Sequence, residues 1–207
     1  MLFRSTDGNA GNDYAVTFVT ATGSITAKAL TITGATAADR TYNGLATASV
    51  DVTGAALSGV VEGDAVTLVT TGVTATFPDK AVGAGRTVTF AGFAITGDDA
   101  TNYALVQPTG LTVDITQAAT TVTITCTPSV VYTGAAQTPC TASVTGAGGL
   151  DEALVVSYGP NTNVGTVNVS ASYAGTTNYA ADTDSTSFDI TQKQLSVNAV
   201  EIGRAHV

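Results

Sequence analysis

The segment TVTIT at residues 121–125 alternates polar and apolar side chains with a period of two. The segments TVTF at residues 87–90 and TVNVS at residues 166–170 repeat this alternation. Because successive side chains of a strand point to opposite faces of a sheet, the pattern predicts strands with one buried and one exposed face. The branched side chains of Val, Thr and Ile also suit strands. These segments predict a fold built from β-sheets.

The composition of the whole chain agrees with an all-β fold. About one residue in five of the 207 is Thr, strong helix formers are scarce, and no stretch has the spacing of an amphipathic helix. Turn residues separate the short strands every eight to twelve positions or so, as in β-sandwiches. The competing architecture is a parallel β-helix, which needs a period of about twenty residues that the sequence does not show. We therefore expect tandem Ig-like antiparallel β-sandwich modules in an elongated array.

The charge of the chain argues against two classes of partner. The formal net charge is -9 and the pI is about 4.1, whereas nucleic acids and anionic membranes attract basic patches. No stretch of the sequence has the length and apolarity of a membrane span. We expect no nucleic-acid partner and no membrane insertion, and we interpret the acidity as an aid to solubility.

Both ends of the chain match the translation of a sequencing adapter. Residues 202–207 can be encoded by ATC GGA AGA GCA CAC GTC, and residues 2–5 by CTC TTC CGA TCT. We expect residues 1–5 and 201–207 to be adapter artefacts of a metagenomic fragment; the alternative is a natural terminus with a chance match. The single histidine, His206, would then not belong to the protein, which removes His-based catalysis and metal binding.

Three short phrases recur along the chain. The spacing of the first phrase gives one repeat of about ninety residues and a second of about seventy-five, and both lengths fit a small β-sandwich. The phrases are Asn12-Asp13-Tyr14 with Asn102-Tyr103 and Asn178-Tyr179, Tyr42-Asn43-Gly44 with Tyr132-Thr133-Gly134, and Val82-Gly83 with Val164-Gly165.

These repeats divide the chain into modules. We expect residues 6–30 to be the tail of a truncated upstream repeat, residues 31–117 and 118–193 to be two complete β modules, and residues 194–200 to begin another. Each module runs almost directly into the next. Because such short connections restrict hinge motion, the array is expected to behave as a semi-rigid rod.

Four turn phrases follow one another in residues 31–117, namely Tyr42-Asn43-Gly44, Leu57-Ser58-Gly59-Val60, Gly63-Asp64 and Asn102-Tyr103. By these phrases residues 31–117 resemble the YDG repeat of large bacterial surface and secreted proteins, with Asn43 where the family has Asp. Residues 118–193 are similar to the MBG, or bacterial Ig-like, repeat. The resemblance implies a stalk in a haemagglutinin-like adhesin, located outside the cell.

Cys126 and Cys140 are the only cysteines in the sequence. In an exported chain such a pair suggests one structural disulfide, closing a loop of about fifteen residues and stabilising by roughly 3 kcal/mol. The alternative is two unpaired buried thiols. A metal site is not expected, because no other thiol or trusted imidazole completes four ligands.

Two further groups of side chains admit a functional interpretation. Acidic residues are expected in turns, where they either bind calcium or are simply solvated; the clusters are Asp98 with Asp99, Asp182 with Asp184, Asp151 with Glu152, and Glu62 with Asp64. Tyrosines at repeated positions are either structural, with a buried ring and a bonded hydroxyl, or form a sugar-binding strip; they are Tyr14, Tyr42, Tyr103, Tyr132 and Tyr179.

The sequence therefore predicts a non-catalytic stalk of a secreted or cell-surface bacterial adhesin-like protein. No catalytic or cofactor-binding residue is expected, and the expected partners are the neighbouring repeats of the same chain, together with a host or cell-surface ligand of unknown identity. The alternative is an extracellular β module that binds glycans or calcium. A hydrolase is not expected, because the chain has no G-x-S-x-G motif and no trusted His for a triad.

Overall fold

The computed structural model describes residue 17 and residues 19–197. The first Asn-Tyr phrase, at residues 12–14, lies outside the described residues. So do the two adapter-like segments, with His206, and the last three residues of the segment 194–200.

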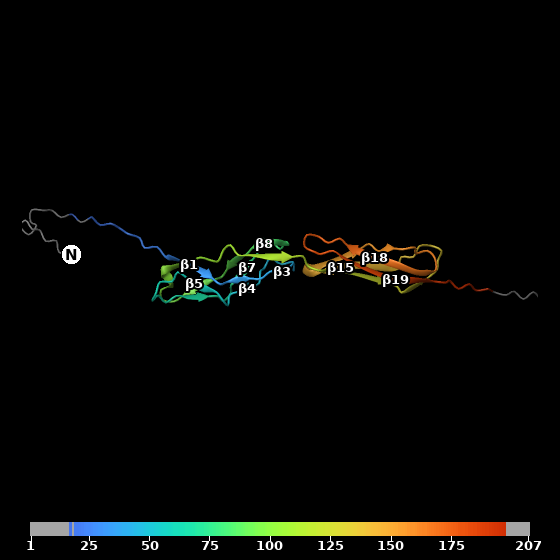
Figure 1. Ribbon diagram of the computed structural model, residues 1–207, viewed down its shortest axis with the longest axis horizontal. Coiled ribbons are helices and arrows are strands. Elements are labelled where there is room, and N and C mark those ends of the chain that lie inside the picture. Colours follow the sequence, from blue (N-terminus) through green and yellow to red (C-terminus); the bar gives the residue numbers. More distant parts are fainter. Residues whose placement is uncertain (1–16, 18, 198–207) are drawn as a thin grey trace, which may run out of the picture.

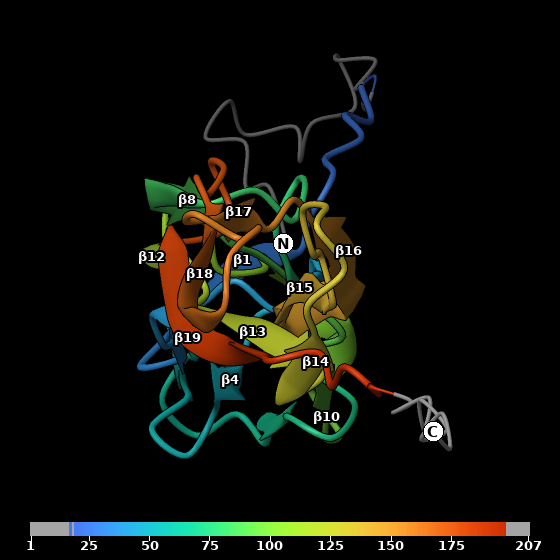
Figure 2. The same ribbon diagram turned by 90° about the vertical axis from the view of Figure 1, so that its right-hand side faces the viewer.

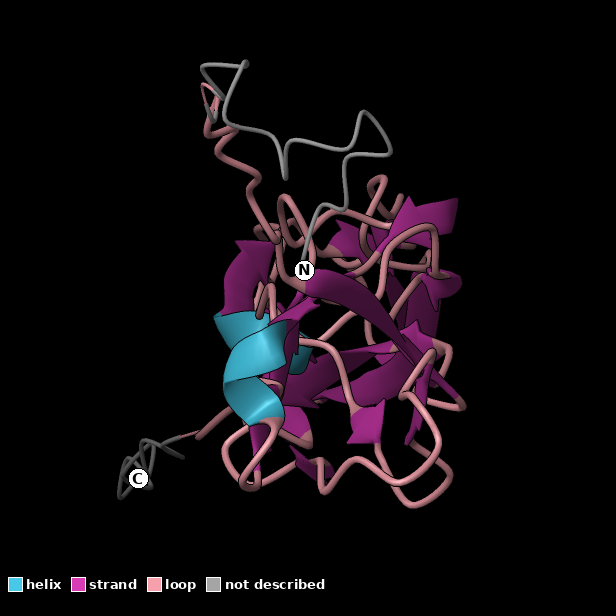
Figure 3. Ribbon diagram, turned by 90° about the vertical axis from the view of Figure 1, so that its left-hand side faces the viewer, coloured by secondary structure: helices cyan, strands magenta, loops and turns pink. Residues whose placement is uncertain are grey.

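The described chain is all-β and elongated, with two groups of strands that follow one another along the long axis (Figure 1). We call Lys28–Thr116 the N-terminal unit and Thr120–Thr191 the C-terminal unit. No sheet of the described residues takes strands from both units. Strands dominate both (Figure 3), and the two helices among the described residues are single 3-10 turns, η1 (Ala100–Asn102) and η2 (Ala147–Gly149). No described helix has the length and apolarity to span a membrane.

The strands of the N-terminal unit are mostly short, and a glycine of positive φ directly follows several of them. They are β1 (Lys28–Thr33), β2 (Thr36–Ala37), β3 (Arg40–Thr41), β4 (Val50–Asp51), β5 (Ala56–Ser58), β6 (Thr67–Val69), β7 (Thr74–Thr76), β8 (Gly83–Thr87), β9 (Thr89–Ala91), β10 (Ala94–Thr96), β11 (Tyr103–Leu105) and β12 (Thr112–Thr116).

The first and last strands of the N-terminal unit each lie at the centre of a three-stranded sheet. Strand β1 pairs in parallel with β11 and antiparallel with β5, and β12 pairs in parallel with β3 and antiparallel with β8. Three two-stranded sheets, β2-β4, β7-β9 and β10-β6, complete the unit. The first and last strands of the unit are thus each hydrogen-bonded to a neighbouring strand on both edges.

Alternation along these strands creates the core of the N-terminal unit. Val88 and Phe90 are buried, whereas Thr87 and Thr89, which alternate with them, are exposed, as the TVTF segment predicts. Leu30 on β1 is fully buried. The prediction that residues 28–30 belong to the tail of an upstream repeat is wrong, because these residues lie in β1 and pair with β11 of the N-terminal unit.

The C-terminal unit consists of two sheets. Antiparallel β13-β15-β16 forms one, and β14-β19-β18-β17 forms the other (Figure 2). The TVTIT and TVNVS segments lie in β13 and β18 as predicted. The strands are β13 (Thr120–Cys126), β14 (Ser129–Val131), β15 (Cys140–Gly146), β16 (Leu150–Leu154), β17 (Ser157–Tyr158), β18 (Gly165–Tyr173) and β19 (Asp182–Thr191).

Two carboxylates connect the two sheets of the C-terminal unit. The Asp182 carboxylate accepts the backbone N–H of Val122 at 2.7 Å, and the Asp184 carboxylate accepts that of Ile124 at 3.1 Å. Both N–H groups lie on the free edge of β13, which has no strand on this side. The prediction that Asp182 and Asp184 lie in a turn is wrong, because both lie in β19 and cap an edge strand.

Replacing these carboxylates is expected to weaken the C-terminal unit. Asp182→Ala and Asp184→Ala should each lower its free energy of unfolding by about 1.5 kcal/mol or more, because a charged acceptor is lost and a strand N–H loses its partner. Asp189→Ala is the matched control, since its exposed carboxylate on the same strand accepts only the Thr166 hydroxyl; its effect should stay within about 0.5 kcal/mol. Urea unfolding measures all three, and equal effects would contradict the capping role.

Candidate functional site: the junction between the two units

The chain passes from one unit to the other through three residues. Strand β12 ends at Thr116 and β13 begins at Thr120. Between them, Ala118 forms a parallel bridge to Tyr179, with its N–H on the Asn178 carbonyl at 3.0 Å and its carbonyl on the Ala180 N–H at 2.9 Å. The connection is therefore held in an extended, hydrogen-bonded conformation, and Ala118 is buried.

A loop of the C-terminal unit contacts the end of the N-terminal unit. We call residues 176–179, which include the third Asn-Tyr phrase, the Asn-Tyr loop. The Asn178 side-chain oxygen accepts the backbone N–H of Val82 at 3.1 Å. The Gln117 amide donates to the loop carbonyls of Thr176 at 2.7 Å and Tyr179 at 3.3 Å. The loop is thus bonded to both the N-terminal unit and the connection.

Two tyrosines meet across the junction. The rings of Tyr42 and Tyr179 pack edge to face, with centroids 5.2 Å apart and an interplanar angle of 79°. Tyr42 is 4% exposed, and Tyr179 packs against the buried core of the N-terminal unit. Aromatic pairs of this geometry contribute about 0.5–1.5 kcal/mol beyond the area they bury. The junction therefore continues the N-terminal core into the C-terminal unit.

Two glycines allow the units to approach closely. A Cβ atom added to Gly44 would lie 2.8 Å from the Gly148 Cα, and one added to Gly148 would lie 3.0 Å from the Gly44 Cα. Gly44 has a φ of 79°, which also favours glycine. Any side chain at either position would push the two backbones apart.

The turn that carries Gly44 is fixed by the side chain before it. The Asn43 side-chain oxygen accepts the Leu45 N–H at 3.0 Å and also a bond from Arg40. Such a turn needs a short side chain with an acceptor oxygen, which Asn and Asp share. The other copy of this phrase, Tyr132-Thr133-Gly134, forms the same turn, since the Thr133 hydroxyl accepts the Ala135 N–H at 3.3 Å and Gly134 has a φ of 86°.

The tyrosines of the Asn-Tyr phrases bond to a turn within their own unit. The Tyr179 hydroxyl donates to the Ala147 carbonyl at 2.7 Å. The Tyr103 hydroxyl donates to the Asp64 carboxylate and accepts the Val61 N–H. The buried ring of Tyr103, the half-buried ring of Tyr179 and their bonded hydroxyls favour the structural interpretation of these tyrosines over a sugar-binding strip. Tyr132 differs, because 36% of it is exposed.

The hydroxyl of Tyr103 is expected to make the protein less stable in alkali. Its hydrogen bond to Asp64, followed by burial, raises the pKa of Tyr103 above its ordinary value near 10. In the unfolded chain this tyrosine ionises first, so its contribution is complete below about pH 10 and is lost as the pH rises through the folded pKa. Unfolding midpoints of Tyr103→Phe should therefore fall less steeply above pH 10 than those of the unchanged chain, and equal slopes would refute this.

The expected disulfide is present. Cys126 and Cys140 are bonded to each other and lie directly opposite in the β13–β15 register. The described residues contain no group of three or more His, Cys, Asp or Glu side chains that could hold a metal ion. Of the acidic clusters, Asp151 and Glu152 lie in β16 rather than in a turn, while Asp99 accepts the Ala65 N–H at 2.8 Å. Calcium binding at these positions stays an alternative to solvated carboxylates.

The recurring phrases are visible in the sequence, but their contacts across the junction are not. Asn178 of the C-terminal unit bonds to Val82 of the N-terminal unit, and Tyr179 packs against Tyr42. Two junction residues, Gln117 and Gly148, were not candidates. A signal for Gln117 was present, because Ile-Thr-Gln occurs at residues 115–117 and again at 190–192.

Comparisons with known proteins identify one part of the chain. Neither the curated proteins nor the solved structures contain a significant match. A family model does match, and it covers nearly all of the N-terminal unit. Residues 26–110 match the model of the YDG domain.

Proposed function

We propose that this chain is a non-catalytic structural stalk fragment of a secreted or cell-surface bacterial adhesin-like protein. The two units are then consecutive repeats, a YDG module at residues 31–117 with β1 added at its start, and an MBG or bacterial Ig-like sandwich at residues 118–193. Their work is spatial, because each repeat adds length and a soluble acidic surface between an anchor and a distal domain.

The observation that carries this proposal is the junction. A connection of three residues, a ring pair, a glycine pair and side-chain bonds from Asn178 and Gln117 join the units at one orientation. Relative motion of domains is the usual expectation unless their interface is extensive. Here the linker itself forms part of the interface. This arrangement suits a spacer, because a spacer must keep a constant length.

The disulfide supports an extracellular location. Disulfides persist in oxidising compartments and are rare in the cytosol. The Cys126–Cys140 bond closes a loop in the C-terminal unit, and a cytosolic protein would gain little from it.

Rotational diffusion tests the proposal. In NMR relaxation measurements, both units should report the same anisotropic tumbling, with the correlation time of one elongated body of the whole chain. Independent tumbling of the units would overturn the stalk. A glycan array and a calcium-dependent thermal shift test the alternative, and saturable binding in either would favour a binding module over a spacer.

A further inference from the structure

The far end of the C-terminal unit repeats the backbone of the junction. In the N-terminal unit Gly83 on β8 lies opposite Ile115 on the last strand, and in the C-terminal unit Gly165 on β18 lies opposite Ile190 on the last strand. The correspondence extends to a third strand. The Tyr42 N–H donates to the Thr116 carbonyl at 2.8 Å, and the Tyr132 N–H donates to the Thr191 carbonyl at 2.9 Å.

By these registers, each junction residue of the N-terminal unit has an equivalent residue at the far end of the C-terminal unit. Tyr132 corresponds to Tyr42, Val164 precedes Gly165 as Val82 precedes Gly83, and Gln192 follows the last strand as Gln117 does. Gly134, with its positive φ, corresponds to Gly44. The C-terminal unit therefore presents the complete set of residues that receives an Asn-Tyr loop.

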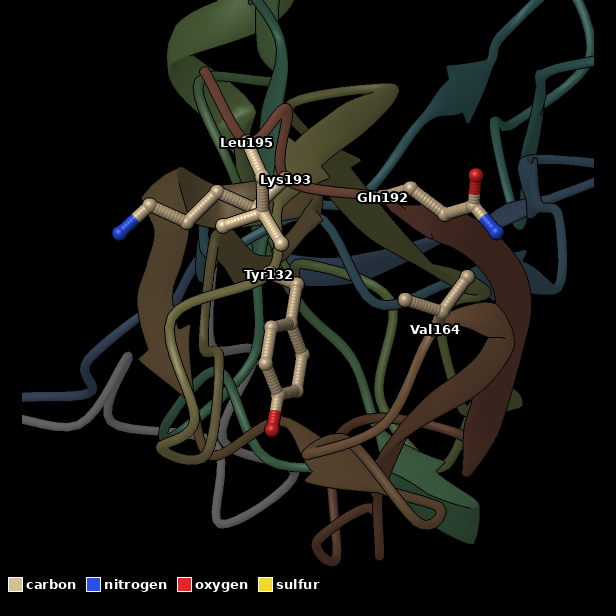
Figure 4. Close-up of a pocket in the computed structure, with 5 residues that line it drawn as sticks. All are labelled: Tyr132, Val164, Gln192, Lys193 and Leu195. Atoms are coloured by element: carbon tan, nitrogen blue, oxygen red, sulfur yellow. The ribbon is translucent and has the colours of Figure 1, made fainter. Parts of the chain in front are cut away.

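The two sets differ in what covers them. Tyr42 is 4% exposed beneath Tyr179, whereas Tyr132 is 36% exposed and Val164 is 49% exposed. An open pocket of about 400 Å³ lies here, lined by Tyr132, Val164, Gln192, Lys193 and Leu195 (Figure 4). A Cβ atom at Gly134 would meet no atom closer than 3.8 Å, so the approach that Gly44 makes to Gly148 is still open.

The segment that leaves this end resembles the first strand of the N-terminal unit. Residues 193–197 (KQLSV) align with residues 28–32 (KALTI), with a lysine first and apolar residues at the third and fifth positions. Leu30 and Ile32 are 0% and 9% exposed, whereas Leu195 and Val197 are 86% and 90% exposed. These exposed side chains match those that a YDG-type unit places in its core.

We propose that the pocket around Tyr132 is the docking site for the Asn-Tyr loop of a following module of the YDG type, whose first strand begins at Lys193. This deepens the proposed stalk function and rests on it. By the observed junction, an Asn side-chain oxygen of the incoming loop accepts the Val164 N–H, its Tyr ring packs against Tyr132, and the Gln192 amide donates to loop carbonyls. The equivalent loop of a YDG unit is residues 97–103, in which Tyr103 pairs with Lys28 as Tyr179 pairs with Ala118.

The test extends the chain by one module. Residues 1–192 are followed by a second copy of residues 28–117, so that the copied Lys28 takes the place of Lys193. Amide hydrogen exchange is then measured at Val164 in the extended and the original chains. We expect exchange at Val164 to slow by roughly tenfold or more, because its N–H gains a buried acceptor.

Two variants assign the protection to the loop. Asn102→Ala in the added copy alone should return Val164 to its original exchange rate while the amides of the copied β1 and β11 stay protected. Asn178→Ala is the matched control at the existing junction, where it should speed exchange at Val82. Tyr132 should also become less reactive toward iodination in the extended chain.

Two results would overturn the inference. One is a folded third module with unchanged exchange at Val164 and unchanged reactivity at Tyr132. The other is an added copy that stays unfolded, because the pocket then fails to accept the module that the register predicts. Neither result would contradict the stalk proposal, which is tested separately by the tumbling of the two units in the original chain.

Discussion

Replacing Gly44 by alanine is expected to separate the two units while leaving each of them folded. The added Cβ would lie 2.8 Å from the Gly148 Cα, which is a backbone atom that cannot rotate away. Relief requires the units to move apart, which also breaks the Tyr42–Tyr179 contact and the bond from Val82 to Asn178. NMR relaxation should then report two correlation times in place of one, and exchange of the Val82 amide should quicken about tenfold or more.

Gly134→Ala is the matched control for this variant. Gly134 occupies the same turn position with nearly the same φ, 86° against 79°, so both alanines carry the same left-handed cost of about 1–2 kcal/mol. Only Gly44 faces a neighbouring backbone. Common tumbling should therefore survive in Gly134→Ala and be lost in Gly44→Ala, and loss in both or in neither would show that the glycine contact does not hold the junction.

Removing the disulfide is expected to cost the C-terminal unit about 3 kcal/mol. The bond joins residues 14 positions apart, and a loop of this length restricts the unfolded chain by about that amount. For a unit of this size the melting temperature should fall by roughly 12–24 °C. A Cys126→Ala, Cys140→Ala double variant and the reduced original chain should agree in calorimetry and urea unfolding.

The N-terminal unit supplies the control for the disulfide, because it contains no cysteine. Its amide protection should remain within about 0.5 kcal/mol of the original in both the variant and the reduced chain. An unchanged C-terminal unit would mean that the seven residue pairs of the β13–β15 ladder hold the two strands together without the disulfide.

Much of the fold could be predicted because its strands follow a period of two. The TVTIT and TVNVS segments alternate cleanly, and the structure places both in strands with every second side chain turned inward. The disulfide could be predicted because only one pairing of two cysteines exists. The start of β1 could not be predicted because KALTIT, at residues 28–33, closely follows the pair Ile25-Thr26. This pair resembles the end of a module, and the sequence does not show whether the residues after it belong to that module or to the next one.

The junction could not be predicted because its contacts join residues far apart in the sequence. Gly44 and Gly148 read as ordinary turn glycines, and only the packing of the units reveals that neither tolerates a side chain. The edge caps at Asp182 and Asp184 were missed for a similar reason. A short acidic side chain is typical of turns, and its use as an acceptor for another strand depends on how the two sheets face each other.

The parallel pairing of the last strands has a mechanical consequence. Strand β12 lies in parallel beside β3, and β19 lies in parallel beside β14. Ladder hydrogen bonds run across the strands, so tension applied along the chain loads the bonds of each pair together, in shear, and cannot unzip them one at a time. Between the two units the same tension passes through the Ala118 bridge. Each last strand is also paired on its other side, β12 with β8 and β19 with β18, so a fibre under flow would distribute its load over both ladders of each strand.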